Sequence, residues 1–160
     1  MPDMSNPLTR HLDSPPNLYE KDYYRWLEQT AVHLRKQAFD QLDLENLIEE
    51  IEDMGRSEKR AIESNLRVVL LHLLKWKYQP QYRSGSWRGS ITEHRIRIRK
   101  ALQDSPSLKN YLPDIFPETY QDAINIASQE TGLELEICAT SCEWTLQQIL
   151  DEEWLPDEML

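Results

Sequence analysis

Residues 44–76 read LENLIEEIEDMGRSEKRAIESNLRVVLLHLLKW, and this stretch decides the fold. Its apolar residues recur at the spacing of one helix face, first at Leu44, Leu47, Ile48, Ile51 and Met54, opposite an almost wholly acidic outer face. The phase continues to Trp76, and residues 66–74 are apolar nearly all round, which predicts the central, most buried helix. Gly55 followed by Ser57 is typical of a helix end and a new N-cap. The pattern therefore predicts one long helix or a helix pair, kinked near Gly55.

Helical periodicity also dominates the sequence on both sides of this stretch. It predicts a first helix over about residues 20–38, a loop over 78–85 marked by Pro80, and a basic helix over about 86–103. Ser105-Pro106 predicts the start of a short helix, and Pro117 predicts the start of another that ends at Gly132. The capping box Thr145–Gln148 predicts a last helix that reaches about Glu153. Residues 133–137 alternate like a strand, but the chain offers no second strand, so we expect an extended loop there. The fold class is all-α, a single-domain bundle of about five to seven helices.

The length, composition and net charge fit one soluble domain. The chain has 160 residues, 39% of them apolar and 29% charged, with a net charge of −10. We expect a flexible arm over residues 1–17, a single helical domain over 18–156 and a tail over 157–160. The N-terminal sequence lacks a signal peptide's apolar core, and no apolar run approaches the ~20 residues of a membrane span. The two cysteines suit reduced thiols, so the sequence predicts a cytoplasmic protein that does not enter a membrane.

The charge is divided unevenly along the chain. Residues 75–100 (KWKYQPQYRSGSWRGSITEHRIRIRK) hold eight Lys or Arg and one acid, a formal +7, while the other residues sum to −17. Helical phase places Arg88, Arg95 and Arg99, here called the arginine ridge, beside the apolar arc of the basic helix. The ridge has an available intramolecular partner in the acidic face made by Glu45, Glu49, Glu52 and Asp53. Alternatively, it binds an anionic ligand or is simply solvated.

An anion-binding site would combine the ridge with the preceding loop. Phosphates would meet arginines while aromatic side chains stacked on bases, as nucleic-acid binders do. The candidate binding residues are Lys77, Tyr82, Arg83, Arg88, Arg95 and Arg99.

Other chemistry finds little support in the sequence. None of the histidines has an Asp, Glu or Cys at the helical spacing of a metal pair, so no metal is expected. His72 and His94 suit hydrogen-bonded core positions, with a paired general base as the alternative. There is no nucleophile elbow, and GSWRG (residues 85–89) lacks the Walker ending, so we expect no catalytic residue and no cofactor.

Two long segments carry a family resemblance. Residues 44–108, with the motifs EEIE, Gly55-Arg56-Ser57, HLLKW and SWRGSI, and residues 130–156, ending in WTLQQILDE, resemble the bacterial family called domain of unknown function 29. The resemblance implies a small, mainly helical intracellular protein and brings no activity, cofactor or catalytic residue. One departure is Glu143, where family members tend to have Pro.

The split charge and the lack of an assembled catalytic motif favour a non-enzymatic module that binds another protein or itself. The alternative is a nucleic-acid or phosphate-binding protein that uses the basic helix 86–103 and the loop 77–88. A hydrolase or nuclease with a His94-centred or acid-centred site is the third hypothesis.

Overall fold

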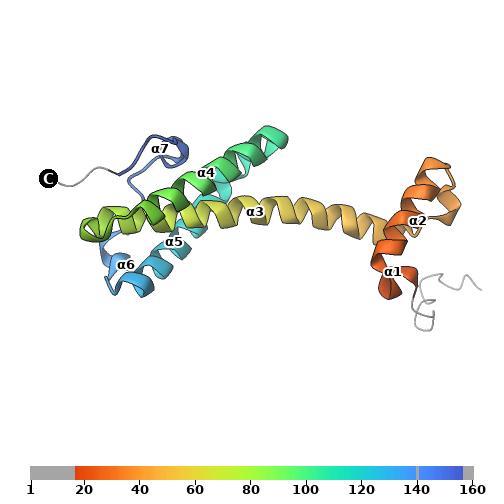
Figure 1. Ribbon diagram of the computed structural model, residues 1–160, viewed down its shortest axis with the longest axis horizontal. Helices are drawn as coiled ribbons and strands as arrows, with labels where there is room; N and C mark the ends of the chain where they lie inside the picture. The colour runs from red at the N-terminus through yellow and green to blue at the C-terminus, as the bar shows by residue number, and fades with distance from the viewer. Residues whose placement is uncertain (1–16, 140, 157–160) are drawn as a thin grey trace, which may run out of the picture. The chain divides into compact units, whose positions relative to one another are not determined.

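The computed structural model describes residues 17–139 and 141–156, and within these ranges it contains helices and turns but no strand (Figure 1). The predicted all-α fold is thereby confirmed. The predicted arm falls almost wholly on residues 1–16 and the predicted tail on 157–160, both outside the described residues. The α-helices are α1 (Leu18–Lys21), α2 (Tyr23–Arg35), α3 (Leu44–Tyr78), α4 (Gly85–Asp104), α5 (Leu112–Thr131), α6 (Leu135–Cys138) and α7 (Leu146–Leu150), with single 3-10 turns at Phe39–Gln41, Pro80–Tyr82 and Pro106–Asn110.

The long central helix is one continuous element. α3 runs through Gly55 for 35 residues, so the alternative of a broken helix pair is wrong. Asp43 caps its N-terminus, because the Asp43 Oδ1 accepts a hydrogen bond from the backbone N–H of Asn46 at 3.3 Å. A glycine inside a helix costs only about 1 kcal/mol relative to alanine, which the long, well-capped helix tolerates.

Internal contacts divide the chain into two units, residues 1–53 and 54–160. The first unit contains α1, α2 and the first turns of α3. Trp26 is 4% exposed and lies against the rings of Tyr19 and Tyr23 at 4.9 and 6.0 Å. Both tyrosine hydroxyls donate hydrogen bonds to the carboxylate of Glu50, at 2.5 and 2.7 Å. A single domain over 18–156 stays a prediction.

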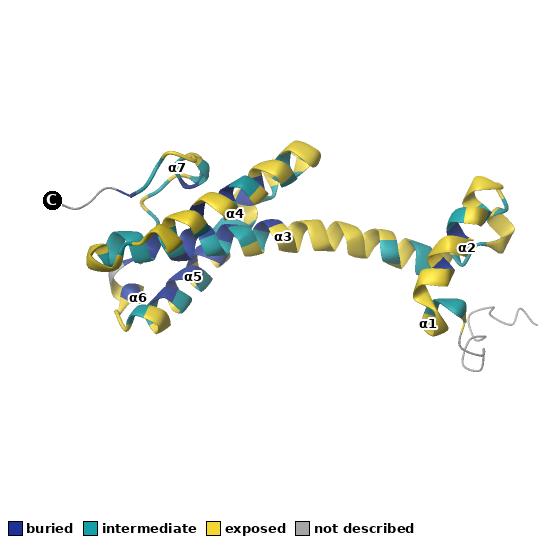
Figure 2. Ribbon diagram, in the orientation of Figure 1, coloured by how far each residue is buried: buried dark blue, intermediate teal, exposed yellow. Residues whose placement is uncertain are grey.

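The second unit holds the main core. The C-terminal half of α3 lies between α4 and α5, with dark blue, buried residues along the contact (Figure 2). Residues 66–74 are the most buried segment, as predicted, because Leu66, Val69, Leu70, Leu73 and Leu74 are fully buried. The same cluster includes Ile91 and Ile98 of α4, Ala123, Ile124 and Ala127 of α5, and Ile149 of α7.

Several predicted boundaries need correction. The first long helix ends at Arg35, because Gln37 adopts a left-handed conformation with φ 55°. α5 begins at Leu112, and Pro117 lies inside it instead of opening it; that early position leaves a single first-turn carbonyl without its usual N–H donor. Residues 135–138 form a short helix instead of an extended loop, and α7 ends at Leu150. The capping box of Thr145 and Gln148 and the Gly132 helix end are confirmed.

Candidate functional site

Arg95, the middle residue of the arginine ridge, is buried. Only 2% of it is exposed, and its guanidinium crosses from α4 to the chain around α7. Nε donates to the carbonyl of Ile149 at 2.7 Å and Nη1 to the carbonyl of Trp154 at 2.9 Å. Burial lowers the pKa of Arg95 from its ordinary value, and the nearby carboxylates of Asp151 and Glu152 oppose that shift. Arg95 therefore holds residues 149–154 against α4.

The other two ridge residues are exposed. Nη1 of Arg99 forms an ion pair with Glu152, and Arg88 lies on the outer surface of α4. Arg95 and Arg99 thus both contact residues 149–154. Between α4 and this segment is a cavity of about 320 Å³, here called the α4–α7 cavity, lined by Arg95, Ile98, Arg99, Leu102, Gln103, Lys109, Leu150 and Glu152.

The loop residues of the predicted site lie elsewhere on the second unit. Arg83 donates through Nε to the carbonyl of Trp76 at 2.8 Å, and its guanidinium lies 5.1 Å from the centre of the Trp76 ring. The Lys77 ammonium is 3.0 Å from the Glu143 carboxylate, and Tyr82 is 62% exposed. Of the six candidate residues, Arg95 and Arg99 line the α4–α7 cavity, and Lys77, Tyr82, Arg83 and Arg88 do not.

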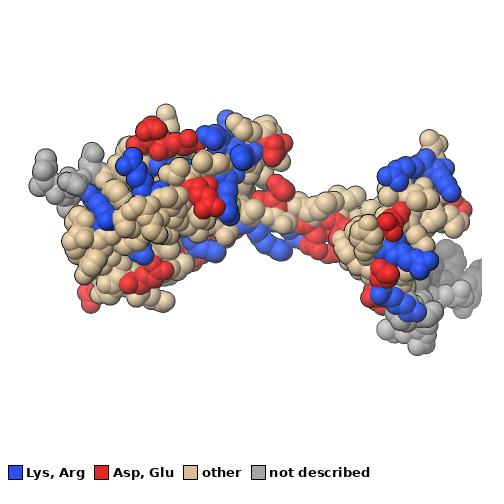
Figure 3. Space-filling view, in the orientation of Figure 1, with Lys and Arg blue, Asp and Glu red and all other residues tan. Residues whose placement is uncertain are grey.

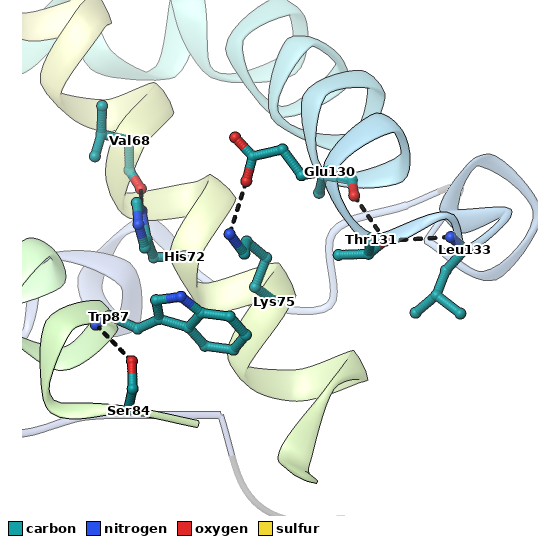
Figure 4. A network of polar contacts seen from close by, with 9 residues as sticks. Val68, His72, Lys75, Ser84, Trp87, Glu130, Thr131 and Leu133 are labelled. Atoms are coloured by element: carbon teal, nitrogen blue, oxygen red, sulfur yellow. Dashed lines mark hydrogen bonds and ion pairs between the residues drawn. The ribbon is translucent and has the colours of Figure 1, made fainter. Parts of the chain in front are cut away.

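Lys75 of the basic stretch contacts two other helices of the second unit. Its ammonium pairs with Glu130 of α5 at 2.7 Å and lies 4.8 Å from the centre of the Trp87 ring of α4 (Figure 4). The ammonium thus joins three helices. With Arg97, which pairs with Glu93 at 2.5 Å, most basic side chains of residues 75–100 have a partner within the chain.

The surface agrees with this pairing. On the face of the second unit turned to the viewer, acidic and basic groups lie side by side and do not form one basic field (Figure 3). A continuous basic surface is the usual electrostatic footprint of a nucleic-acid binder.

The two inward histidines are both half-buried. Nδ1 of His72 is 2.9 Å from the carbonyl of Val68, as Figure 4 shows, and Nδ1 of His94 is 2.7 Å from the carbonyl of Ser90. Both partners lie one turn earlier in the same helix. Burial lowers the pKa of His72, and the nearby charge of Lys75 lowers it further, against the opposing effects of the Val68 carbonyl and Glu130. Each histidine has the hydrogen bond expected of a core position.

Sequence reasoning missed an exposed apolar surface on the first unit. Leu44, Ile48 and Ile51, here called the α3 stripe, are 54%, 55% and 56% exposed. The helical phase of these residues was visible in the sequence, but phase alone does not say whether an apolar face is covered. Residues 17–53 also hold most of the other exposed large apolar side chains of the described chain: Tyr23, Tyr24, Leu27, Val32, Leu34 and Phe39.

No helix among the described residues is long and apolar enough to span a bilayer. Comparison with curated proteins and with solved structures found no match. The model of one protein family, described as domain of unknown function DUF29, matches residues 18–155. That match runs through both units and nearly all of the helices described above, so this chain belongs to the DUF29 family.

Proposed function

We propose that this chain is a non-enzymatic interaction protein whose first unit binds a basic amphipathic helix of another protein. The observation that carries the proposal is the α3 stripe, whose three side chains are each more than half exposed. They follow one another at intervals of four and three residues, which is the spacing at which apolar side chains of one helix contact a second helix. Clustered apolar exposure of this kind marks interaction sites on soluble proteins.

The weak core of the first unit supports the proposal. Among its described residues, only Trp26 and Thr30 are buried. Small units that bury few residues often need a disulfide, a metal or association with another chain to become stable. A partner on the α3 stripe would supply apolar burial that the first unit lacks.

Charge favours a basic partner over a second copy of this chain. Residues 43–53 carry six carboxylates and no Lys or Arg. Two such helices placed side by side would repel each other, whereas lysines flanking an apolar stripe on the partner would find opposite charges. Tyr19 and Tyr23 donate hydrogen bonds to one of these carboxylates, that of Glu50.

The nucleic-acid alternative has weaker support. Arg95 uses two of its nitrogens on backbone carbonyls, and Arg99 is paired with Glu152. Phosphate binding through the ridge would require these contacts to be exchanged.

The test is fluorescence anisotropy of a labelled model peptide in which a leucine stripe is flanked by lysines, with a matched peptide carrying glutamates in place of the lysines. We expect saturable binding of the lysine peptide alone. Each of Ile48→Asp and Ile51→Asp should weaken it by about tenfold, because burying an isoleucine contributes roughly 1.5–3 kcal/mol. The matched control is Ile137→Asp in α6, at a side chain that is 71% exposed and lies on the second unit.

Two results would contradict the proposal. If Ile137→Asp weakens binding as much as the stripe variants do, the peptide is attracted by charge in general and not by the stripe. If sedimentation equilibrium finds a dimer that Ile48→Asp dissolves, a second copy occupies the stripe instead of a basic partner. Circular dichroism would establish that each variant keeps its helices.

A further inference from the structure

Arg95, one of the residues that line the α4–α7 cavity of the second unit, has an incomplete set of hydrogen bonds. Arg95 is 98% buried, and two of its nitrogens donate to the Ile149 and Trp154 carbonyls. Its Nη2 is also buried and has no hydrogen-bond acceptor among the described residues. An unsatisfied buried donor on a charged group costs free energy, so such atoms call for a physical explanation.

The charges around this cavity favour an anion. Arg95, Arg99 and Lys109 line it together with a single carboxylate, that of Glu152, which gives a formal lining charge of +2. The side chains of Arg99 and Glu152 are 49% and 37% exposed, and they form an ion pair with each other. An exposed pair of this kind contributes little to stability, so a ligand's anionic group can replace Glu152 at little cost.

The remaining walls select a ligand with an apolar part. Ile98, Leu102 and Leu150 contribute aliphatic surface beside the cations. At about 320 Å³ the cavity is at the small end of ligand pockets, which typically measure roughly 300–1,000 Å³. Inorganic phosphate would use the cations and leave the aliphatic walls bare.

We propose that the α4–α7 cavity binds a small organic anion, with its carboxylate or phosphate group toward Arg95, Arg99 and Lys109 and a short apolar body against Leu102 and Leu150. Glu152 occupies the anion's place in the ligand-free protein and exchanges with it. The site is on the second unit and is independent of helix binding by the α3 stripe.

Amide chemical-shift titration of the full chain tests this, with hexanoate, hexyl phosphate, hexanol and inorganic phosphate as separate probes. We expect hexanoate or hexyl phosphate to shift the amides of residues 95–109 and 149–152 saturably, with Kd on the order of 1 mM. Hexanol and inorganic phosphate should bind at least several times more weakly, since hexanol lacks the anionic group and inorganic phosphate lacks the apolar body.

Three variants separate binding from structure. Arg99→Gln with Lys109→Gln should abolish the response, while Arg88→Gln with Lys100→Gln, on exposed positions of the same helix, should leave it unchanged. Glu152→Gln should bind about two- to fivefold more tightly, because it removes the competing carboxylate of an exposed pair. A purely structural role for these residues would not produce that gain.

The proposal is overturned by any of three results. These are no saturable shift with either hexyl anion, equal binding of hexanol, or an unchanged response in the Arg99→Gln/Lys109→Gln variant. No saturable shift would mean that the Arg95 guanidinium serves the fold alone.

Discussion

Replacing Arg95 by methionine should destabilise the second unit far more than any other change on the arginine ridge. Methionine keeps much of the apolar stem of arginine but has no donor for the carbonyls of Ile149 and Trp154. Hydrogen bonds from a charged donor contribute about 1.5–3 kcal/mol each. Part of that loss is offset because a buried cation no longer has to be desolvated. We expect a net loss of about 2–4 kcal/mol.

Arg99→Met is the matched control for this prediction. It lies one turn further along α4, and its ion pair with Glu152 is exposed, so its loss should be below about 1 kcal/mol. The loss of stability in Arg95→Lys should lie between those of Arg95→Met and Arg99→Met. One ammonium does not reproduce the planar guanidinium that donates to two carbonyls.

The assay is urea unfolding followed by circular dichroism and tryptophan fluorescence. With a slope of about 2 kcal/mol per molar urea, Arg95→Met should lower the midpoint by roughly 1–2 M and leave the slope unchanged. Hydrogen exchange should show the amides of residues 149–154 losing protection first. The reasoning is refuted if Arg95→Met lies within about 0.5 kcal/mol of Arg99→Met.

Gly55→Ala should raise stability by up to about 1 kcal/mol, visible as a higher melting temperature, because the added methyl group meets no atom within 4 Å and alanine favours the helix; a lower melting temperature would contradict this. The lowered pKa of His72 means that the folded state prefers the neutral ring, so its stability contribution is present above pH 6.5 and is lost as pH falls through the folded pKa. Urea midpoints measured across that range should depend less on pH in His72→Gln, and an unchanged dependence would count against the assignment. The hydrogen bond to Glu50 raises the pKa of Tyr19 to about 12, and a tyrosine ring NMR titration should find it protonated at about pH 11 in the wild type but largely ionised in Glu50→Gln. Partial burial raises the pKa of the Cys142 thiol, so its alkylation should be slower in the folded protein than in urea; equal rates in both would argue against this shielding.

Local patterns in the sequence predicted the elements that depend on near neighbours. The apolar phase of residues 66–74 marked the most buried helix, and the capping box at Thr145 marked the start of α7. The alternation at residues 133–137 misled, because a helix as short as α6 has too few residues for its period to be distinguished from a strand's.

Contacts between distant residues were out of reach of the same reasoning. Arg95 donates a hydrogen bond to a carbonyl 54 residues away. Nothing in the local sequence pattern distinguishes Arg95 from Arg99, which is also an arginine on the same ridge. Charge alone does not specify which carboxylate lies near an arginine, and the pair of Arg99 with Glu152, 53 residues later, could not be read from the sequence.

The attachment of residues 149–154 to Arg95 has a consequence for biosynthesis. A ribosome adds about 5–20 residues per second, so Arg95 is synthesised several seconds before its two acceptor carbonyls exist. During that interval Arg95 remains hydrated, and Ile91 and Ile98, which share a buried cluster with Ile149, lack part of their cover. The second unit therefore completes its core only after residues 149–154 have been made, and a pause in translation between the codons for α4 and α7 would prolong the time in which a chaperone, or another nascent chain, meets that uncovered surface.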